Sequence, residues 1–183
     1  LTEWDRTADR AVSADDFVTP APIALPKSDP EAVDQLARSL VAEVAPKIPA
    51  DLGPKLAAEW AQLGEATVAE QASLWDQTGV MSLFLRNLET AQWAFARAVL
   101  TDPERDTAVA NLGFVMAESG RYEEAMLLYA RARELDPDAR TTNSNIAWVF
   151  SRHNQLDEAI AYHRKAAEQC PGIAQYHLNL GAV

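Results

Sequence analysis

The chain has a single cysteine, Cys170, among its 183 residues, so it cannot form an intramolecular disulfide bond. Its longest apolar run, from Val80 to Leu85, is broken by Ser82 and is far too short to span a bilayer. No signal peptide is visible, yet the chain begins at Leu1, so either processing or a fragment is expected. These features are compatible with a protein of the cytoplasm and with a protein of the periplasm.

Basic residues are few: 16 Lys and Arg stand against 27 Asp and Glu, a formal charge of −11. An acidic surface repels nucleic acid and anionic membranes, so we expect neither as a partner. The charge favours solubility and a partner with basic patches. The hydrophobic fraction of 48% is that of a folded protein and is too high for a disordered one.

Histidine is also scarce, with three residues in the chain. His163, His177 and Cys170 are the one candidate set of metal ligands, but a packing or surface position is the favoured interpretation. No Ser-His-Asp or Cys-His arrangement and no Gly-rich phosphate loop is recognisable. We therefore expect no catalytic residue, no metal and no cofactor.

The first 29 residues are acidic and carry Pro20, Pro22 and Pro26 within seven positions. Proline restricts the backbone and lacks an amide donor, so residues 1–29 are predicted to be an extended linker or strap. We expect the repeats to keep their thermal stability without residues 1–28. Residues 30–71 show helical periodicity, beginning with Asp29 as a cap, and are interpreted as an N-terminal helical cap or a degenerate repeat.

An internal repeat of 34 residues organises the rest of the chain. Shifting the sequence by 34 superposes small residues, prolines and acidic residues in several columns. Three of the seven glycines share one column, which makes coincidence a poor explanation. The columns include Gly79, Gly113 and Gly181; Ala91, Ala125 and Ala159; Ala98, Ala132 and Ala166; and Pro103, Pro137 and Pro171.

These columns resemble the tetratricopeptide repeat (TPR), whose pattern is Trp, Leu-Gly, Tyr, Ala, Phe, Ala and Pro. Trp75, Phe95 and Tyr129 supply aromatic positions of that pattern, and His163 stands where a third ring is usual. The resemblance implies an all-α solenoid of helix-turn-helix units over 72–183. The units are 72–105, 106–139 and 140–173, followed by the first helix of a fourth at 174–183.

In this family the first helices line a concave groove that binds peptides. Asn111, Asn145 and Asn179 recur there at the same repeat position. An amide side chain both donates and accepts, so this ladder is expected to hold a peptide backbone, unless Asn is merely a consensus residue. Phe114 and Trp148 follow one turn later and are interpreted as groove anchors or, alternatively, as core residues.

Chaperone-binding members of the family clamp a terminal carboxylate with Lys and Arg on this face. The equivalent positions here carry no basic residue, and Arg152 alone does not restore such a clamp. A chaperone-type carboxylate clamp is therefore not expected.

Two functions from different classes remain. The first is a non-catalytic interaction module, an adaptor, assembly factor or scaffold subunit, that binds a protein or peptide in the groove. Such a chain could belong to a larger complex, for example in a bacterial envelope, or to a homo-oligomer. The second is a substrate-recruiting TPR segment of a larger enzyme such as a glycosyltransferase.

Overall fold

Helix termini in this chain follow from local sequence. In the computed structural model, which describes residues 20–61 and 67–169, the Asp29 carboxylate accepts from the Ala32 amide at 3.0 Å and caps the first helix, as predicted. Thr67 and Glu70 form a reciprocal capping box at the start of the third helix. These caps satisfy amides that have no partner inside the helix.

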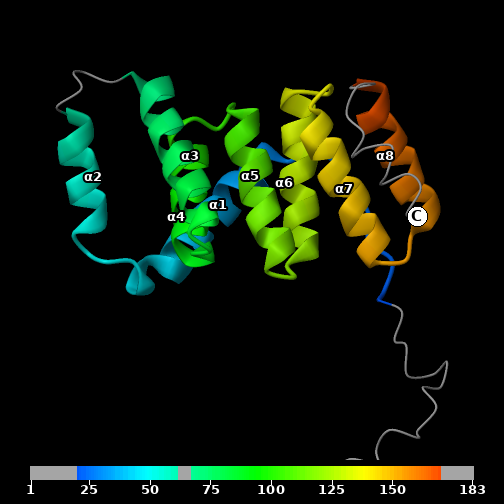
Figure 1. The fold of residues 1–183 in the computed structure, drawn as a ribbon, viewed down its shortest axis with the longest axis horizontal. Coiled ribbons are helices and arrows are strands. Elements are labelled where there is room, and N and C mark those ends of the chain that lie inside the picture. Colours follow the sequence, from blue (N-terminus) through cyan, green and yellow to red (C-terminus); the bar gives the residue numbers. More distant parts are fainter. Residues whose placement is uncertain (1–19, 62–66, 170–183) are drawn as a thin grey trace, which may run out of the picture.

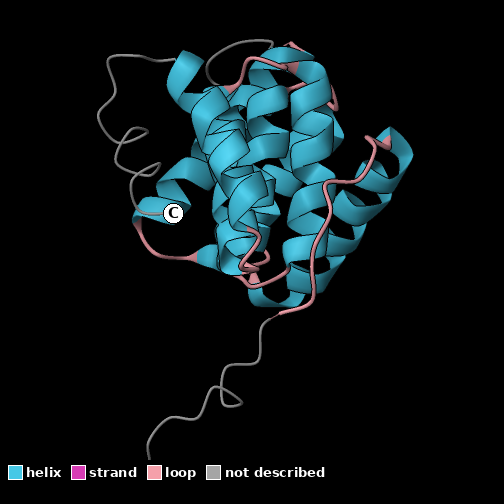
Figure 2. Ribbon diagram, turned by 90° about the vertical axis from the view of Figure 1, so that its right-hand side faces the viewer, coloured by secondary structure: helices cyan, strands magenta, loops and turns pink. Residues whose placement is uncertain are grey.

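The described residues form eight α-helices and one 3-10 turn, and they contain no strand (Figures 1 and 2). The bounds are α1 Pro30–Val44, η3 Ala45–Lys47, α2 Leu52–Ala61, α3 Val68–Phe84, α4 Leu88–Thr101, α5 Asp106–Glu118, α6 Tyr122–Leu135, α7 Arg140–Arg152 and α8 Leu156–Gln169. Helices α3 to α8 stack as three antiparallel pairs, which confirms the predicted all-α solenoid.

The turn inside each pair repeats the same backbone geometry. The left-handed residues are Arg86 at φ 59°, Gly120 at φ 76° and Asn154 at φ 57°, and they are 34 positions apart. The backbone amide of the next residue donates to the carbonyl five positions earlier: Asn87 to Ser82, Arg121 to Met116 and Gln155 to Phe150, at 2.9, 2.9 and 3.0 Å. This is a Schellman ending, which forces the chain to reverse after each first helix.

The core runs continuously along the stack. The six alanines at 91, 98, 125, 132, 159 and 166 are fully buried. In the first pair, Trp75 of α3 packs edge-on against Trp93 of α4 with ring centroids 5.1 Å apart. Small residues let paired helices approach closely, and aromatic rings fill the remaining volume.

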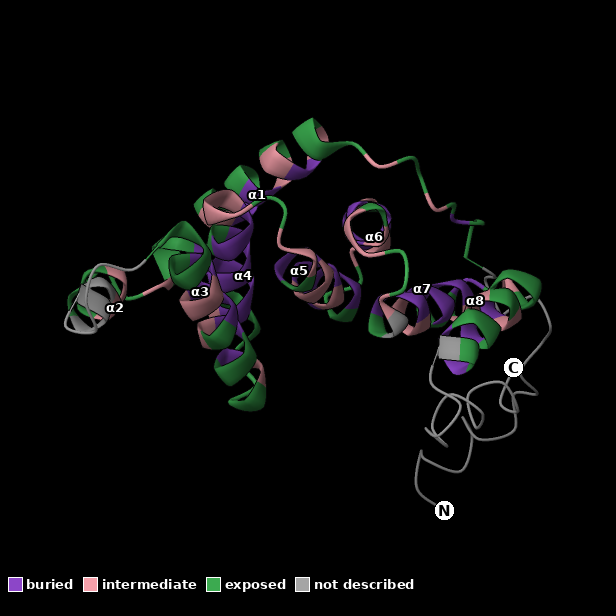
Figure 3. Ribbon diagram, turned by 90° about the horizontal axis from the view of Figure 1, so that it is seen from above, coloured by how far each residue is buried: buried purple, intermediate pink, exposed green. Residues whose placement is uncertain are grey.

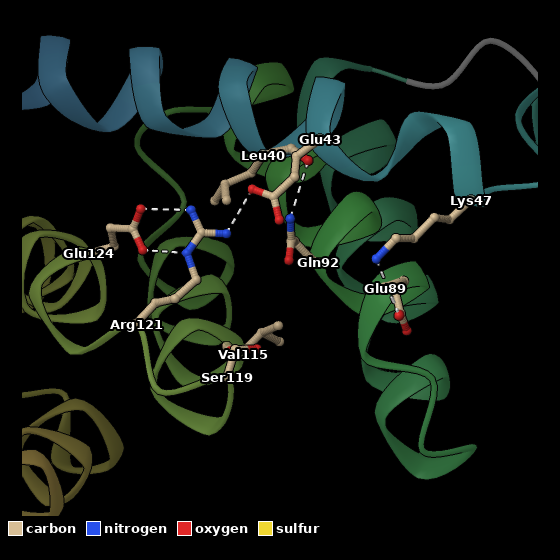
Figure 4. A network of polar contacts seen from close by, with 9 residues as sticks. All are labelled: Leu40, Glu43, Lys47, Glu89, Gln92, Val115, Ser119, Arg121 and Glu124. Atoms are coloured by element: carbon tan, nitrogen blue, oxygen red, sulfur yellow. Dashed lines mark hydrogen bonds and ion pairs between the residues drawn. The ribbon is translucent and has the colours of Figure 1, made fainter.

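Helix α1 lies along the side of the stack formed by α4 and α6 (Figure 3). Val33, Ala37, Leu40 and Val44 form its buried face. Polar contacts hold its C-terminal half (Figure 4): Gln92 donates to the Leu40 carbonyl at 3.3 Å, and Arg121 pairs with Glu43 at 2.8 Å. The interpretation of 30–71 as one cap or repeat stays a prediction, because residues 62–66 lie outside the described part.

Residues 20–29 form no helix and run from the start of α1 towards the third helix pair (Figure 3). Ile23 is buried, and its amide donates to Gln155 Oε1 at 2.6 Å. His153 Nδ1 lies 2.9 Å from the Ala21 carbonyl, in the neighbouring turn. These contacts join a segment at the start of the chain to a turn more than 130 positions later.

Candidate peptide-binding groove

A hollow of about 620 Å³ lies between the first helices of the three pairs, α3, α5 and α7. We call it the apolar hollow. Its apolar lining consists of Val80, Leu83, Phe84, Leu88 and Phe114. Polar and charged residues complete the lining: Asn111, Thr141, Asn145, Arg86 and Glu118. Phe84 is 79% exposed, which is unusual for a large aromatic side chain on a helix of this kind.

A second hollow of about 430 Å³ adjoins the first and shares Asn111 and Thr141 with it. We call it the acidic hollow, and the two hollows together the groove. Four carboxylates line it, those of Asp76, Asp106, Asp136 and Asp138, and none of the lining residues whose side chains the structure describes is basic. Neutral hydroxyl and amide groups therefore separate an apolar region from an acidic one.

Asn111, the first member of the predicted asparagine ladder, contacts the preceding repeat. Its Nδ2 donates to Asp76 Oδ1 at 2.9 Å, and Arg105 approaches the other carboxylate oxygen of Asp76 at 3.4 Å. Asp76 is buried, so these donors stabilise its charge. Asn111 thus links two repeats while it also lines the groove, and its use for a peptide backbone stays a prediction.

Asn145, the second member, lies between the groove and the core. Burial raises the pKa of the Tyr129 phenol, the nearby Glu118 charge raises it further, and the Asn145 side chain acts against both. Tyr129 therefore stays protonated at neutral pH. The Asn145 amide is held beside a neutral hydroxyl on one side and lines the apolar hollow on the other.

The two aromatic candidates, Phe114 and Trp148, occupy different places. Phe114 is half-buried and lines the apolar hollow. Trp148 is 38% exposed, packs edge-on against Tyr122 at 6.2 Å, and has the Arg152 guanidinium 5.9 Å from its ring. Trp148 and Arg152 line neither hollow, and their place in a partner-binding groove stays a prediction.

Sequence reasoning missed the residues of the first pair that shape the apolar hollow, above all Phe84. A signal was present, because Phe84 and Leu85 end a helix where polar turn residues are usual. The acidic hollow was also missed, since its carboxylates come from three separate segments. Asn179, Gly181, Pro171, Cys170 and His177 lie outside the described residues, and so does the predicted fourth unit.

Within residues 20–61 and 67–169, no group of three or more His, Cys, Asp or Glu side chains is placed to hold a metal ion. His163 is buried, and its burial lowers the pKa of the imidazole. Over the same described ranges, none of the helices combines the length and apolar character that crossing a membrane requires.

Comparison with known proteins agrees with this architecture. The family model of the tetratricopeptide repeat matches residues 107–139, and a search of curated protein sequences found no significant match. The solved structure of the first TPR of Spaghetti (RPAP3), bound to the HSP90 peptide SRMEEVD, is similar with a TM-score of 0.59 and 14% identity; the match covers 62% of this chain and 90% of that one.

Two structures of MamA are similar as well. MamA 41-end from Desulfovibrio magneticus RS-1 has a TM-score of 0.57 and 18% identity over 87% of this chain and 85% of that one. A further crystal structure of MamA has a TM-score of 0.54 and 20% identity over 81% and 82%. At these identities the likeness shows the fold alone. The matched model, the columns 34 residues apart and the stacked helix pairs together show a tetratricopeptide repeat at residues 107–139 within a stack of similar helix pairs.

Proposed function

We propose that this chain is a non-catalytic adaptor or scaffold that binds an extended segment of a partner protein in the groove between α3, α5 and α7. The fold supports a general role as a protein-interaction module. The similar RPAP3 module was solved with a peptide bound. The recruiting segment of a larger enzyme stays the alternative prediction.

The observation that carries the proposal is the exposed aromatic side chain of Phe84 at the edge of the apolar hollow. Together with Phe114 it offers a large, rigid apolar contact area that water covers when the groove is empty. A bulky side chain of a partner would displace that water. The Asn145 amide beside it can donate to and accept from a peptide backbone.

A peptide-display selection against the full chain tests this proposal. Peptides that are enriched on the wild-type protein are then measured by fluorescence anisotropy against Phe84→Glu and Phe114→Ala. We expect each substitution to weaken binding at least about tenfold, because truncating a central aromatic anchor costs about 2 kcal/mol.

Val68→Glu is the matched control, since Val68 is 60% exposed at the other end of α3 and lines neither hollow. It should leave binding unchanged. Circular dichroism melts of all three variants check that the helices are intact. Selected peptides that bind Phe84→Glu and Phe114→Ala as tightly as wild type would disprove the groove as the binding site.

A further inference from the structure

One stretch of the chain, residues 20–44, contacts all three helix pairs. Helix α1 packs on the second helices α4 and α6 (Figure 3). Gln92 of α4 donates to the Leu40 carbonyl, and Arg121, just before α6, pairs with Glu43 (Figure 4). These contacts tie α1 to the first and second pairs, whereas the groove lies between the first helices α3, α5 and α7.

Residues 20–28, which we call the bridging segment, connect the second pair to the third. At one end of the segment, the Ser28 hydroxyl donates to Glu134 of α6. Near the other end, the Ile23 amide donates to Gln155 Oε1 in the turn between α7 and α8, at 2.6 Å. The Ile23 side chain is part of the hydrophobic core. The segment therefore crosses the junction between the two pairs and is held on both sides of it.

This junction is less extensive than the one before it. The interface between α6 and α7 is smaller than the interface between α4 and α5. Side chains add to it: Tyr122 packs edge-on against Trp148, and Arg133 donates to the Tyr162 hydroxyl at 2.8 Å. In a solenoid each repeat contacts its neighbours alone, so the angle between two pairs depends on a single interface. A segment that crosses the junction restricts this angle further.

The shape of the groove depends on the same angle, since its lining comes from all three pairs. Thr141 and Asn145 of α7 line the apolar hollow together with Phe114 of α5 and Phe84 of α3. A rotation of the third pair relative to the second would displace the α7 side chains from the others. A site that is held in its binding geometry before the ligand arrives loses less entropy on binding.

We propose that residues 20–44 act as a brace: the docked bridging segment fixes the angle between the second and third pairs and keeps the groove preformed. Release of this segment lets the groove change shape and weakens the binding of a partner. By linkage, a partner in the groove strengthens the docking of the segment. The effect on partner binding rests on the proposed function, whereas the effect on the angle does not.

The bridging segment is suited to reversible release. It belongs to no helix, so it can detach while every helix of the stack stays folded. Pro20, Pro22 and Pro26 restrict its backbone, and this lowers the entropy that is lost when the segment docks again.

The test compares Ile23→Asp with Ala24→Asp in the full chain. Both substitutions add one carboxylate to the bridging segment, but Ile23 is buried and Ala24 is exposed. We expect Ile23→Asp alone to release the segment, because burying an unpaired charge is costly. Gln155→Ala removes the acceptor of the Ile23 amide and gives a second, milder release. Circular dichroism should show the same helix content in all three variants.

Spin labels report on the angle in the absence of any ligand. In a Cys170→Ser background, Glu123→Cys and Asp157→Cys place labels at exposed positions on the first turns of α6 and α8. Ile23→Asp should shift and broaden the distribution of distances between these labels, and Ala24→Asp should leave it unchanged. The same distribution in Ile23→Asp as in the wild type would overturn the inference.

Labels at Val68 and Glu123 are the control within the molecule, because they span the first and second pairs, which α1 holds in every variant. Their distance should stay constant. A change of both distances would mean that the whole stack has loosened, and the inference would be wrong.

The binding measurement uses the peptides selected on the wild-type chain. We expect them to bind Ile23→Asp at least about fivefold more weakly and Ala24→Asp as tightly as the wild type. A shifted distance with unchanged affinity would disprove the link between the brace and the groove. If the selection yields no peptide, the proposed function fails, and the label distances alone decide whether the brace exists.

Discussion

The ring of Phe95 occupies the space that a Cβ atom on Gly79 would need: its carbon Cε1 lies 2.5 Å from that position. The next repeat has the same relationship, with Tyr129 Cε1 2.7 Å from a Cβ on Gly113. No real Cβ atom tolerates such distances, so an aromatic ring on the second helix requires glycine on the first. This contact sets how closely the two helices of a pair approach.

Replacing Gly113 by Ala should therefore destabilise the protein by about 1–3 kcal/mol, because the fully buried Tyr129 ring has no room to move. Urea unfolding followed by circular dichroism measures the change. Gly53→Ala is the matched control, since a Cβ there meets Trp93 at an ordinary 3.5 Å. A stable Gly113→Ala variant would show that the pairs can separate without cost.

The third pair departs from this rule in both residues at once. Ala147 stands in the glycine column and His163 in the aromatic column, and both are buried. An imidazole is smaller than a phenyl ring, so it leaves room for the alanine methyl group. We expect His163→Phe to destabilise the protein by about 1–3 kcal/mol, and Ala147→Gly in the same chain to restore most of that loss.

A double-mutant cycle on urea unfolding measures this coupling. The double variant should lose less stability than the two single losses add up to, by an amount of the same order as the His163→Phe loss, because side chains that compete for one space are not independent. Additive effects of Ala147→Gly and His163→Phe would mean that the two side chains do not compete for one space.

Stability should fall in acid because of His163. Its burial lowers the pKa of the imidazole below the usual value of about 6.5, so the folded state holds it neutral while the unfolded chain takes up a proton. The contribution is fully present above pH of about 6.5 and decreases as pH falls below that value. Unfolding free energies from pH 7.5 to pH 5 should decrease less for the Ala147→Gly, His163→Phe double variant than for wild type.

Arg86 holds a left-handed backbone conformation that glycine adopts without strain, and its counterpart one repeat later is Gly120. Arg86→Gly should stabilise the protein by about 0.5–1 kcal/mol, the relief of strain exceeding the added flexibility of the unfolded chain. Asn154→Gly is the comparison, because asparagine tolerates this conformation better and should gain less. Thermal melts that show a lower melting temperature for Arg86→Gly would contradict this account.

The contacts of residues 20–28 argue against the expectation that this segment is dispensable for stability. Ile23 is buried against the stack, so Ile23→Ala should cost about 2 kcal/mol. The exposed Lys27 provides the control, and Lys27→Ala should change little. Equal unfolding midpoints for the two variants would restore the original expectation.

The repeat could be read from the sequence because its main contacts are local. Gly113 meets Tyr129 sixteen positions away, within one unit, and Gly79 meets Phe95 at the same spacing one unit earlier. The groove was only partly predictable for the same reason. Asn111 and Phe114 follow the repeat, whereas Phe84 is specific to the first pair and has no repeating partner to mark it.

By itself, the sequence determined the helix pairs and their order, because small residues and prolines recur at a constant spacing, whereas the side on which the first helices lie was implied by the family resemblance. Tertiary structure alone decided where residues 20–44 pack and which carboxylates line the acidic hollow together. Ile23 reaches Gln155, and Asp76 lies with Asp136, through contacts between distant segments. No periodicity encodes such contacts, because they depend on how the stacked pairs curve and on the surface left for other segments to cover.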